Sequence, residues 1–122
     1  MLNADIKQQD MSISGHPQEP DVHSHLSLQI SGIVRNGIYK NTELEFQVSR
    51  KIDFDPTQKY AGGLIKSKPI LMFTVLTDTE RFGHLVSLVA NKAFKDLYLC
   101  FEPPKYGKAR VISWQLSTSI EE

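Results

Sequence analysis

The sequence has a single cysteine, Cys100, and no long hydrophobic run. One cysteine excludes an intramolecular disulfide framework and fits a reducing compartment. The longest strongly apolar stretch, residues 70–76, is interrupted by Thr74 and is far shorter than the roughly 20 residues of a membrane-spanning helix. The N-terminus has no apolar run of signal-peptide length. These absences predict a soluble, cytoplasmic protein with no membrane segment.

The chain also lacks an excess of charge of either sign, because 14 Lys and Arg balance 14 Asp and Glu over 122 residues. For the chain as a whole, this balance argues against a strongly basic nucleic-acid protein. The length suits one domain with a single hydrophobic core. Hydrophobic residues make up 40% and charged residues 23%, which is the composition of a globular protein.

The first 24 residues differ in composition from the rest of the chain. They contain four acidic residues against one lysine, with several glutamines and serines, two prolines and no aromatic residue. Such a segment buries too little apolar surface to offset an ordering entropy of about 1–2 kcal/mol per residue. We therefore expect a flexible, disordered acidic segment over residues 1–24 and a single globular, β-rich domain over residues 25–122. Met11 is a second candidate for the start, and the sequence does not decide between Met1 and Met11.

Strand patterns begin at Leu26, where apolar and polar residues alternate up to Ser31. The alternation slips at Gly32, which predicts a bulge, a bend or the end of the strand at that point. A second alternating run covers residues 43–49 and predicts a strand with one buried face. Residues 53–68 contain Asp-Pro and Gly-Gly pairs and are predicted to form a long loop.

One helix is predicted in the second half of the chain. Residues 70–76 form a continuous apolar run, which is typical of a strand covered on both faces. Thr77 and Glu80 then have the spacing of a capping box. Apolar residues recur every three or four positions after that box, which predicts a helix over about residues 78–92.

The last part of the chain is predicted to form a β-hairpin. Residues 97–102 and 111–116 both alternate in polarity, and the six residues 103–108 connect them. The apolar face of the second strand is predicted to consist of Ile112, Trp114 and Leu116.

The predicted order is strand, strand, strand, helix, strand, strand. This order resembles the oligonucleotide/oligosaccharide-binding (OB) fold, a five-stranded barrel with a helix between strands 3 and 4. The resemblance covers residues 26–118 and lies in topology alone. A mixed α+β sandwich has the same order of elements. The sequence thus predicts an α+β domain that forms a small five-stranded antiparallel β-barrel or sheet.

No residue constellation points to catalysis, a metal or a cofactor. His23 and His25, with His16, are the nearest approach to a metal motif, but they fall in the predicted flexible segment and lack anchoring ligands. Asp53 and Asp55 lack the further oxygen ligands of a calcium loop, so turn formation before the following proline is the preferred interpretation. We expect a protein that is not an enzyme, with no metal and no cofactor.

The zero net charge of the whole chain conceals an excess of basic residues over residues 26–120. Residues 26–120 contain 13 Lys and Arg against 8 Asp and Glu, a net charge of +5. Lysines interleaved with aromatic rings are the side chains that bind single-stranded nucleic acid, because lysines attract phosphates and rings stack on bases. The residues predicted to bind in this way are Lys59, Tyr60, Lys66, Lys68, Lys105, Tyr106, Lys108 and Arg110.

Two functions follow from these observations as hypotheses. The first is a non-enzymatic binding module that binds single-stranded nucleic acid or another anionic polymer through two long loops. The alternative is a protein–protein interaction or assembly subunit, with an unknown protein partner or a second copy of the chain and no nucleic-acid binding. This alternative rests on Trp114 and on the apolar region around Ile33, Ile38 and Tyr39.

Overall fold

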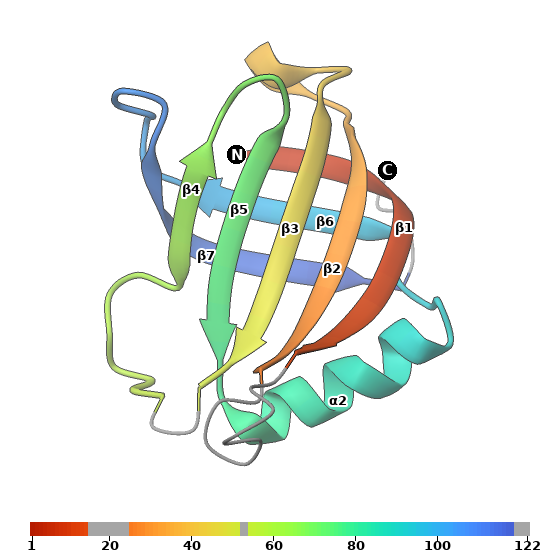
Figure 1. Cartoon of the computed structure of the whole chain (residues 1–122). Helices are drawn as coiled ribbons and strands as arrows, with labels where there is room; N and C mark the ends of the chain where they lie inside the picture. Colours follow the sequence, from red (N-terminus) through yellow and green to blue (C-terminus); the bar gives the residue numbers. More distant parts are fainter. Residues whose placement is uncertain (15–24, 52–53, 119–122) are drawn as a thin grey trace.

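The computed structural model describes residues 1–14, 25–51 and 54–118, whose strands close into a barrel (Figure 1). Around the barrel, the seven strands of the described residues follow the order β1-β2-β3-β5-β4-β7-β6, and β1 pairs with β6 to close the ring. Neighbouring strands are antiparallel, except that β3 and β5 run parallel. The elements are β1 (Leu2–Ser14), β2 (His25–Val34), the 3-10 turn η1 (Gly37–Tyr39), β3 (Glu43–Arg50), β4 (Gly62–Lys66), β5 (Leu71–Thr77), α2 (Thr79–Ala90), β6 (Asp96–Phe101) and β7 (Ala109–Ser117).

The OB-like order predicted from the sequence is therefore wrong. The helix follows the fifth strand and not the third, because β1 and β4 are two strands that the sequence pattern did not reveal. The sheet is also mixed, since β3 and β5 are parallel neighbours, and β4 lies between β5 and β7. The other strands and the helix do form at the predicted places in the chain.

Strand alternation fills the barrel with apolar side chains. In β3, Leu44, Phe46 and Val48 are buried while their neighbours are exposed or half-buried, as predicted. In β5, the inward residues are buried and the outward residues are only half-buried, so this strand is partly covered on both faces. This core fixes which strand faces point outward to solvent.

Helix α2 lies across one end of the barrel (Figure 1) and buries Phe82, Leu85 and Val89. The predicted helix is confirmed, but its cap is not the predicted one. The Asp78 carboxylate accepts a hydrogen bond from the Arg81 amide at 2.6 Å, whereas Thr77 is the buried last residue of β5. Within the described residues, no helix is both long and apolar enough to cross a membrane.

The predicted flexible N-terminal segment does not hold for residues 2–14, which form β1. This strand pairs with β2 over most of its length and with β6 over residues 2–5. Its register shifts between Ile6 and Gln8, opposite Gly32. A Cβ on Gly32 would lie 2.2 Å from the Asp5 carbonyl oxygen, so only glycine permits this close approach of β1. The remaining residues of the predicted segment, 15–24, lie outside the described residues.

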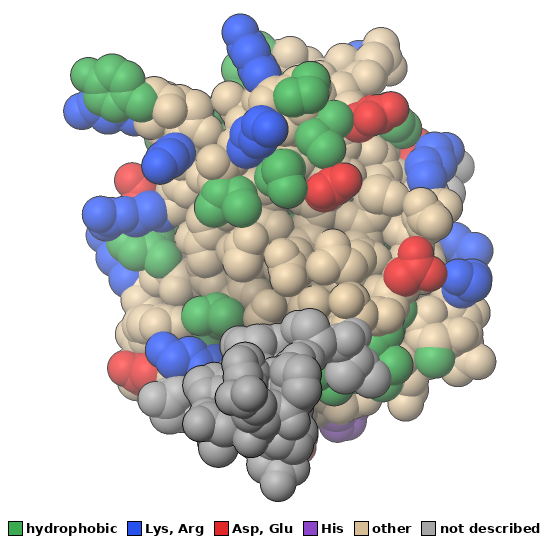
Figure 2. Space-filling model, viewed as in Figure 1, with side chains coloured by type: hydrophobic (Ala, Val, Ile, Leu, Met, Phe, Trp, Pro, Cys, Tyr) green, Lys and Arg blue, Asp and Glu red, His purple; other side chains and the backbone are tan. Residues whose placement is uncertain are grey.

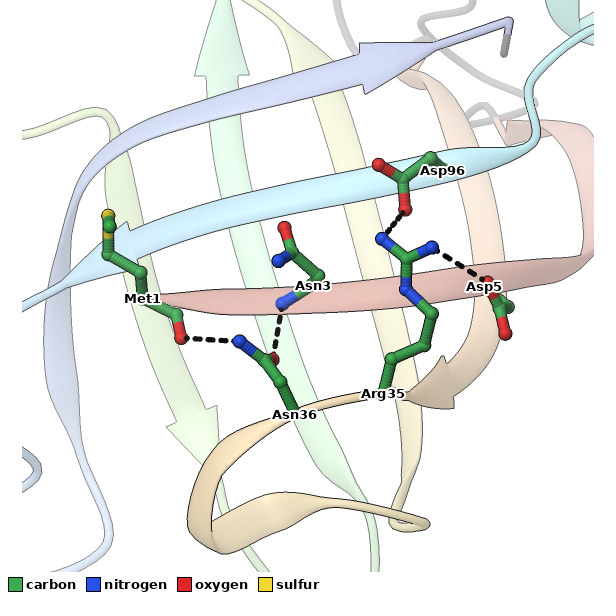
Figure 3. A network of polar contacts seen from close by, with 6 residues as sticks. All are labelled: Met1, Asn3, Asp5, Arg35, Asn36 and Asp96. Atoms are coloured by element: carbon green, nitrogen blue, oxygen red, sulfur yellow. Dashed lines mark hydrogen bonds and ion pairs between the residues drawn. The ribbon is translucent and has the colours of Figure 1, made fainter. Parts of the chain in front are cut away.

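Polar contacts fasten the start of β1 to the end of β2 (Figure 3). The Asn36 side chain accepts a hydrogen bond from the Asn3 amide at 2.9 Å and donates one to the Met1 carbonyl at 3.4 Å. The Arg35 guanidinium lies 2.7 Å from the Asp96 carboxylate on β6 and 3.4 Å from that of Asp5. These contacts join three strands where the barrel closes.

The long loop predicted over residues 53–68 is interrupted by β4. The Gly-Gly pair that reads as a turn begins this strand instead, which pairs with both β5 and β7. A Cβ on Gly62 would lie 2.0 Å from the Thr74 carbonyl oxygen, so the glycine is needed for close strand packing and not for a turn. The connection between β3 and β4 is therefore shorter than predicted.

The apolar face predicted for the last strand is also partly wrong. The pairing of β6 with β7 shifts register between Cys100 and Phe101, and Ile112 is the residue left without a partner in this register. Val111 is consequently buried, whereas Ile112 is 48% exposed. Beyond the shift, the Trp114 ring packs on Phe46 with centroids 5.7 Å apart. The bulge thus changes which side chains of β7 face the core on its N-terminal side, and it leaves Ile112 on the outside.

Candidate functional site

All eight residues predicted to bind an anionic polymer lie on or beside one pair of neighbouring strands, β4 and β7. The pair is held in register by Gly63 opposite Arg110 and by Leu64 opposite Ala109. We call the outer side of this pair and its flanking loops the β4–β7 surface. Its residues are Lys59, Tyr60, Lys66, Lys68, Lys105, Tyr106, Lys108 and Arg110.

One end of the β4–β7 surface is built around Tyr60, just before β4. The Arg110 guanidinium carbon lies 4.9 Å from the centre of the Tyr60 ring, and the Lys59 ammonium lies 5.3 Å from it. Cations at these distances are attracted by the negative face of the ring. Tyr60 itself is half-buried, and its ring contacts both cations at the surface.

The other end is the tip of the β6–β7 hairpin, which packs against the β4–β5 connection. A Cβ on Gly107 would lie 3.1 Å from the Ser67 hydroxyl, so the hairpin tip and Ser67 are in direct proximity. Lys66 and Lys68 flank Ser67 in the chain, and Lys105 and Lys108 flank the tip. All four of these lysines are exposed.

The β4–β7 surface has an excess of positive charge. Residues 59–68 and 105–110 together contain six Lys and Arg and no Asp or Glu, and β5 beside them contains no charged residue. Within the part of the chain that the structure describes, none of the six cations has an ion pair. In Figure 2, blue side chains gather around green ones at the upper left, with one red side chain among them, where Figure 1 places β4 and the β6–β7 hairpin.

The acidic outward residues lie on other strands. Glu43 and Glu45 are exposed on β3, and Asp10 is exposed on β1. Glu102 is the exception, because its backbone amide donates to the Arg110 carbonyl at 3.0 Å, and its side chain is half-buried beside the surface. The exposed acidic residues of the described strands therefore lie on β1 and β3, apart from the β4–β7 surface.

The predicted OB-like order does not explain why these residues lie together, because that order is wrong. What brings residues 59–68 next to residues 105–110 is the pairing of β4 with β7. Because β4 was read as part of a loop, the sequence alone carried no signal for this pairing.

The residues considered for metal binding or acid–base chemistry form no site within the described ranges. No group of three or more His, Cys, Asp or Glu suited to a metal ion occurs among them. His16, His23 and Asp53 lie outside the described residues. Asp55 accepts hydrogen bonds from the Thr57 hydroxyl at 2.6 Å and the Thr57 amide at 2.9 Å, which lower the pKa of its carboxyl group. These contacts form a turn around Pro56.

A groove between α2 and β7 is a feature that the sequence did not predict. It has a volume of about 430 Å³, and its lining combines Arg81 and Leu85 of the helix with Ile112, Trp114 and Leu116 of β7. Ile112, which the register shift leaves without a partner, is part of this lining.

The apolar residues behind the interaction hypothesis are separated by the fold. Trp114 packs on Phe46, and Tyr39 is half-buried against the core. Ile38 is 90% exposed, whereas Ile33 is half-buried. Ile38 is therefore the member of this group that is open to a partner.

Comparison with known proteins adds no functional assignment. The chain matches no protein-family model, no curated protein and no solved structure.

Proposed function

We propose that this protein is a non-enzymatic binding module whose β4–β7 surface binds an extended anionic polymer. Single-stranded nucleic acid is the most concrete ligand of this class. The observation that supports the proposal is the gathering of six cations on or beside one pair of paired strands, where none of them forms an ion pair with a described residue.

The layout of the cations fits a linear ligand. They extend from the Tyr60 end of β4 to the hairpin tip, with Arg110 between the two ends. A flexible chain of phosphates can follow such a line, since each phosphate meets a lysine or an arginine in turn. The six cations are exposed and form no ion pair within the described ranges, so binding requires no such pair to break first.

Electrostatic binding of this kind depends steeply on salt. A protein that neutralises Z phosphates of a single strand loses affinity with a slope of about −0.7Z in log K against log salt. With up to six contacts, a rise from about 50 to 200 mM salt lowers the affinity by up to a few hundredfold. If these lysines are ordinary surface residues without a binding role, no saturable binding is expected.

The test is a titration of a fluorescent single-stranded oligonucleotide at these two salt concentrations. The double variant Lys105→Glu/Lys108→Glu reverses two charges on the β4–β7 surface. The matched control, Lys7→Glu/Lys40→Glu, makes the same change in net charge at exposed positions on β1 and after η1.

We expect micromolar or tighter binding at low salt, weakened at least tenfold in the first variant and less than twofold in the control. No binding by the unmodified protein at low salt contradicts the proposal, as does an equal loss in both variants. Light scattering on the same samples distinguishes the binding module from the alternative, an assembly subunit. A stable oligomer that does not bind the oligonucleotide supports an interaction subunit instead.

A further inference from the structure

The tip of the β6–β7 hairpin has an unusual residue at its most exposed position. Lys105 and Lys108 exchange two backbone hydrogen bonds of 2.8 and 3.1 Å, which leaves Tyr106 and Gly107 as a two-residue turn. Both turn residues have positive φ, 55° and 76°. A tight hairpin turn with positive φ at both positions favours Asn-Gly, and a bulky residue at the first position is strained.

The Tyr106 side chain is not buried, so burial does not offset the strain. It is 93% exposed, so the ring contributes almost nothing to the packing of the barrel. The turn that carries it is nevertheless braced, because Gly107 lies against Ser67 and two hydrogen bonds close the hairpin. Strained backbone that the local packing does not require is typical of a functional position.

The two tyrosines of the β4–β7 surface differ in whether their rings are free. Tyr60 is half-buried and contacts Arg110 and Lys59, so its role is to position these cations. Tyr106 presents an open ring at the tip of the turn that Lys105 and Lys108 close. An open ring on a turn that two lysines close matches an unpaired nucleotide, in which a flat base is attached to a phosphate on either side.

We infer that Tyr106 stacks on an unpaired base, and that this contact selects single-stranded nucleic acid over polyanions without bases. The inference rests on the proposed function, which by itself requires only the cations. A duplex is a poor ligand for this contact, because its bases are already stacked on one another and paired. The flanking lysines contact the phosphates on either side of the stacked base.

The experiment compares two oligonucleotides of equal length and charge, one of thymidines and one abasic, by fluorescence anisotropy with the full chain. Tyr106→Ala removes the ring, and Tyr106→Phe keeps it. Tyr106→Asn removes the ring and also relieves the turn, because asparagine tolerates positive φ. Thermal unfolding of each variant shows whether the barrel is intact.

We expect Tyr106→Ala and Tyr106→Asn to bind the thymidine strand about tenfold more weakly than the unmodified protein, because one stacked base contributes about that factor. Tyr106→Phe should stay within twofold, and all variants should keep the same salt slope. Tyr106→Asn should unfold at a higher temperature while binding more weakly, which separates loss of the ring from loss of the fold. The abasic strand should be bound equally by all four proteins.

Two results overturn the inference in different ways. If the unmodified protein binds the thymidine and abasic strands equally and Tyr106→Asn has no effect, stacking by Tyr106 is wrong while the anion-binding function stands. If the unmodified protein binds neither strand, the proposed function fails together with the inference.

Discussion

The side-chain amide of Gln9 bonds both backbone groups of Phe94. Its nitrogen donates to the Phe94 carbonyl at 2.9 Å, and its oxygen accepts from the Phe94 amide at 3.1 Å. Gln9 is only 6% exposed, so β1 satisfies two backbone groups of the segment between α2 and β6 that would otherwise be buried without partners. This contact ties the N-terminal strand to a residue 85 positions away.

Gln9→Ala should therefore destabilise the protein by about 2 kcal/mol, because it leaves the Phe94 amide and carbonyl unsatisfied. Gln8→Ala, at the exposed neighbouring position, should change the free energy of unfolding by less than about 0.5 kcal/mol. Urea unfolding of both variants measures the difference. Equal effects of the two substitutions would show that the Gln9 contact contributes no stability.

Loss of the Arg35 guanidinium should weaken the barrel closure shown in Figure 3. The Asp96 side chain is 5% exposed and would keep a buried charge after losing a cation at 2.7 Å. We expect Arg35→Met to lower the free energy of unfolding by about 2 kcal/mol, the size of a hydrogen bond to a charged group. The same change at exposed Arg50 serves as the control, and urea midpoints should shift only for Arg35.

Two glycines should respond to alanine with opposite signs. Gly62→Ala places a Cβ 2.0 Å from the Thr74 carbonyl oxygen, so β4 must move and stability should fall by more than about 2 kcal/mol. Gly83→Ala meets no atom within 4 Å on α2 and should stabilise the helix by up to about 1 kcal/mol. Thermal unfolding tests both, and a stabilising Gly62→Ala would contradict the assignment of β4.

The Asp55 carboxyl group should titrate below its ordinary pKa of 3.8, chiefly because the Thr57 hydroxyl donates to the carboxylate, with the Thr57 amide adding a second bond. A lowered pKa in the folded state means that these bonds stabilise the turn above the ordinary pKa. That contribution is lost as the pH falls through the lowered value. Thr57→Val should raise the pKa of Asp55 in a carboxyl NMR titration, and an unchanged value would exclude the hydroxyl as the main cause.

The fold was predictable in those elements whose apolar residues are buried and whose polar residues are exposed. In β3 every second residue is apolar and buried, and α2 carries a regular apolar stripe, so both elements could be placed from the sequence. In β1 the agreement fails, because the strand contains Gln9, a polar residue that is buried against the backbone of Phe94. A composition argument counts such a residue as solvent-exposed, and it therefore predicted a flexible segment.

The β4–β7 surface was predictable in its residues but not in its geometry. Lysines and tyrosines in two acid-free segments can be read directly from the chain. Their adjacency depends on β4, a five-residue strand that begins with two glycines and has the local signature of a turn. Likewise, the exposure of Ile112 depends on a bulge that exists only once β6 and β7 are paired.

The most direct test of the central claim is an NMR titration of the isotope-labelled full chain with a single-stranded oligothymidylate at low salt. We predict saturable amide shift changes concentrated in residues 59–68 and 105–110, with the largest near Tyr106. Amides of α2, and those of β3 around Glu45, should stay unchanged. Shift changes centred instead on the groove between α2 and β7, or no shift changes at saturating oligonucleotide, would contradict the β4–β7 surface as the binding site.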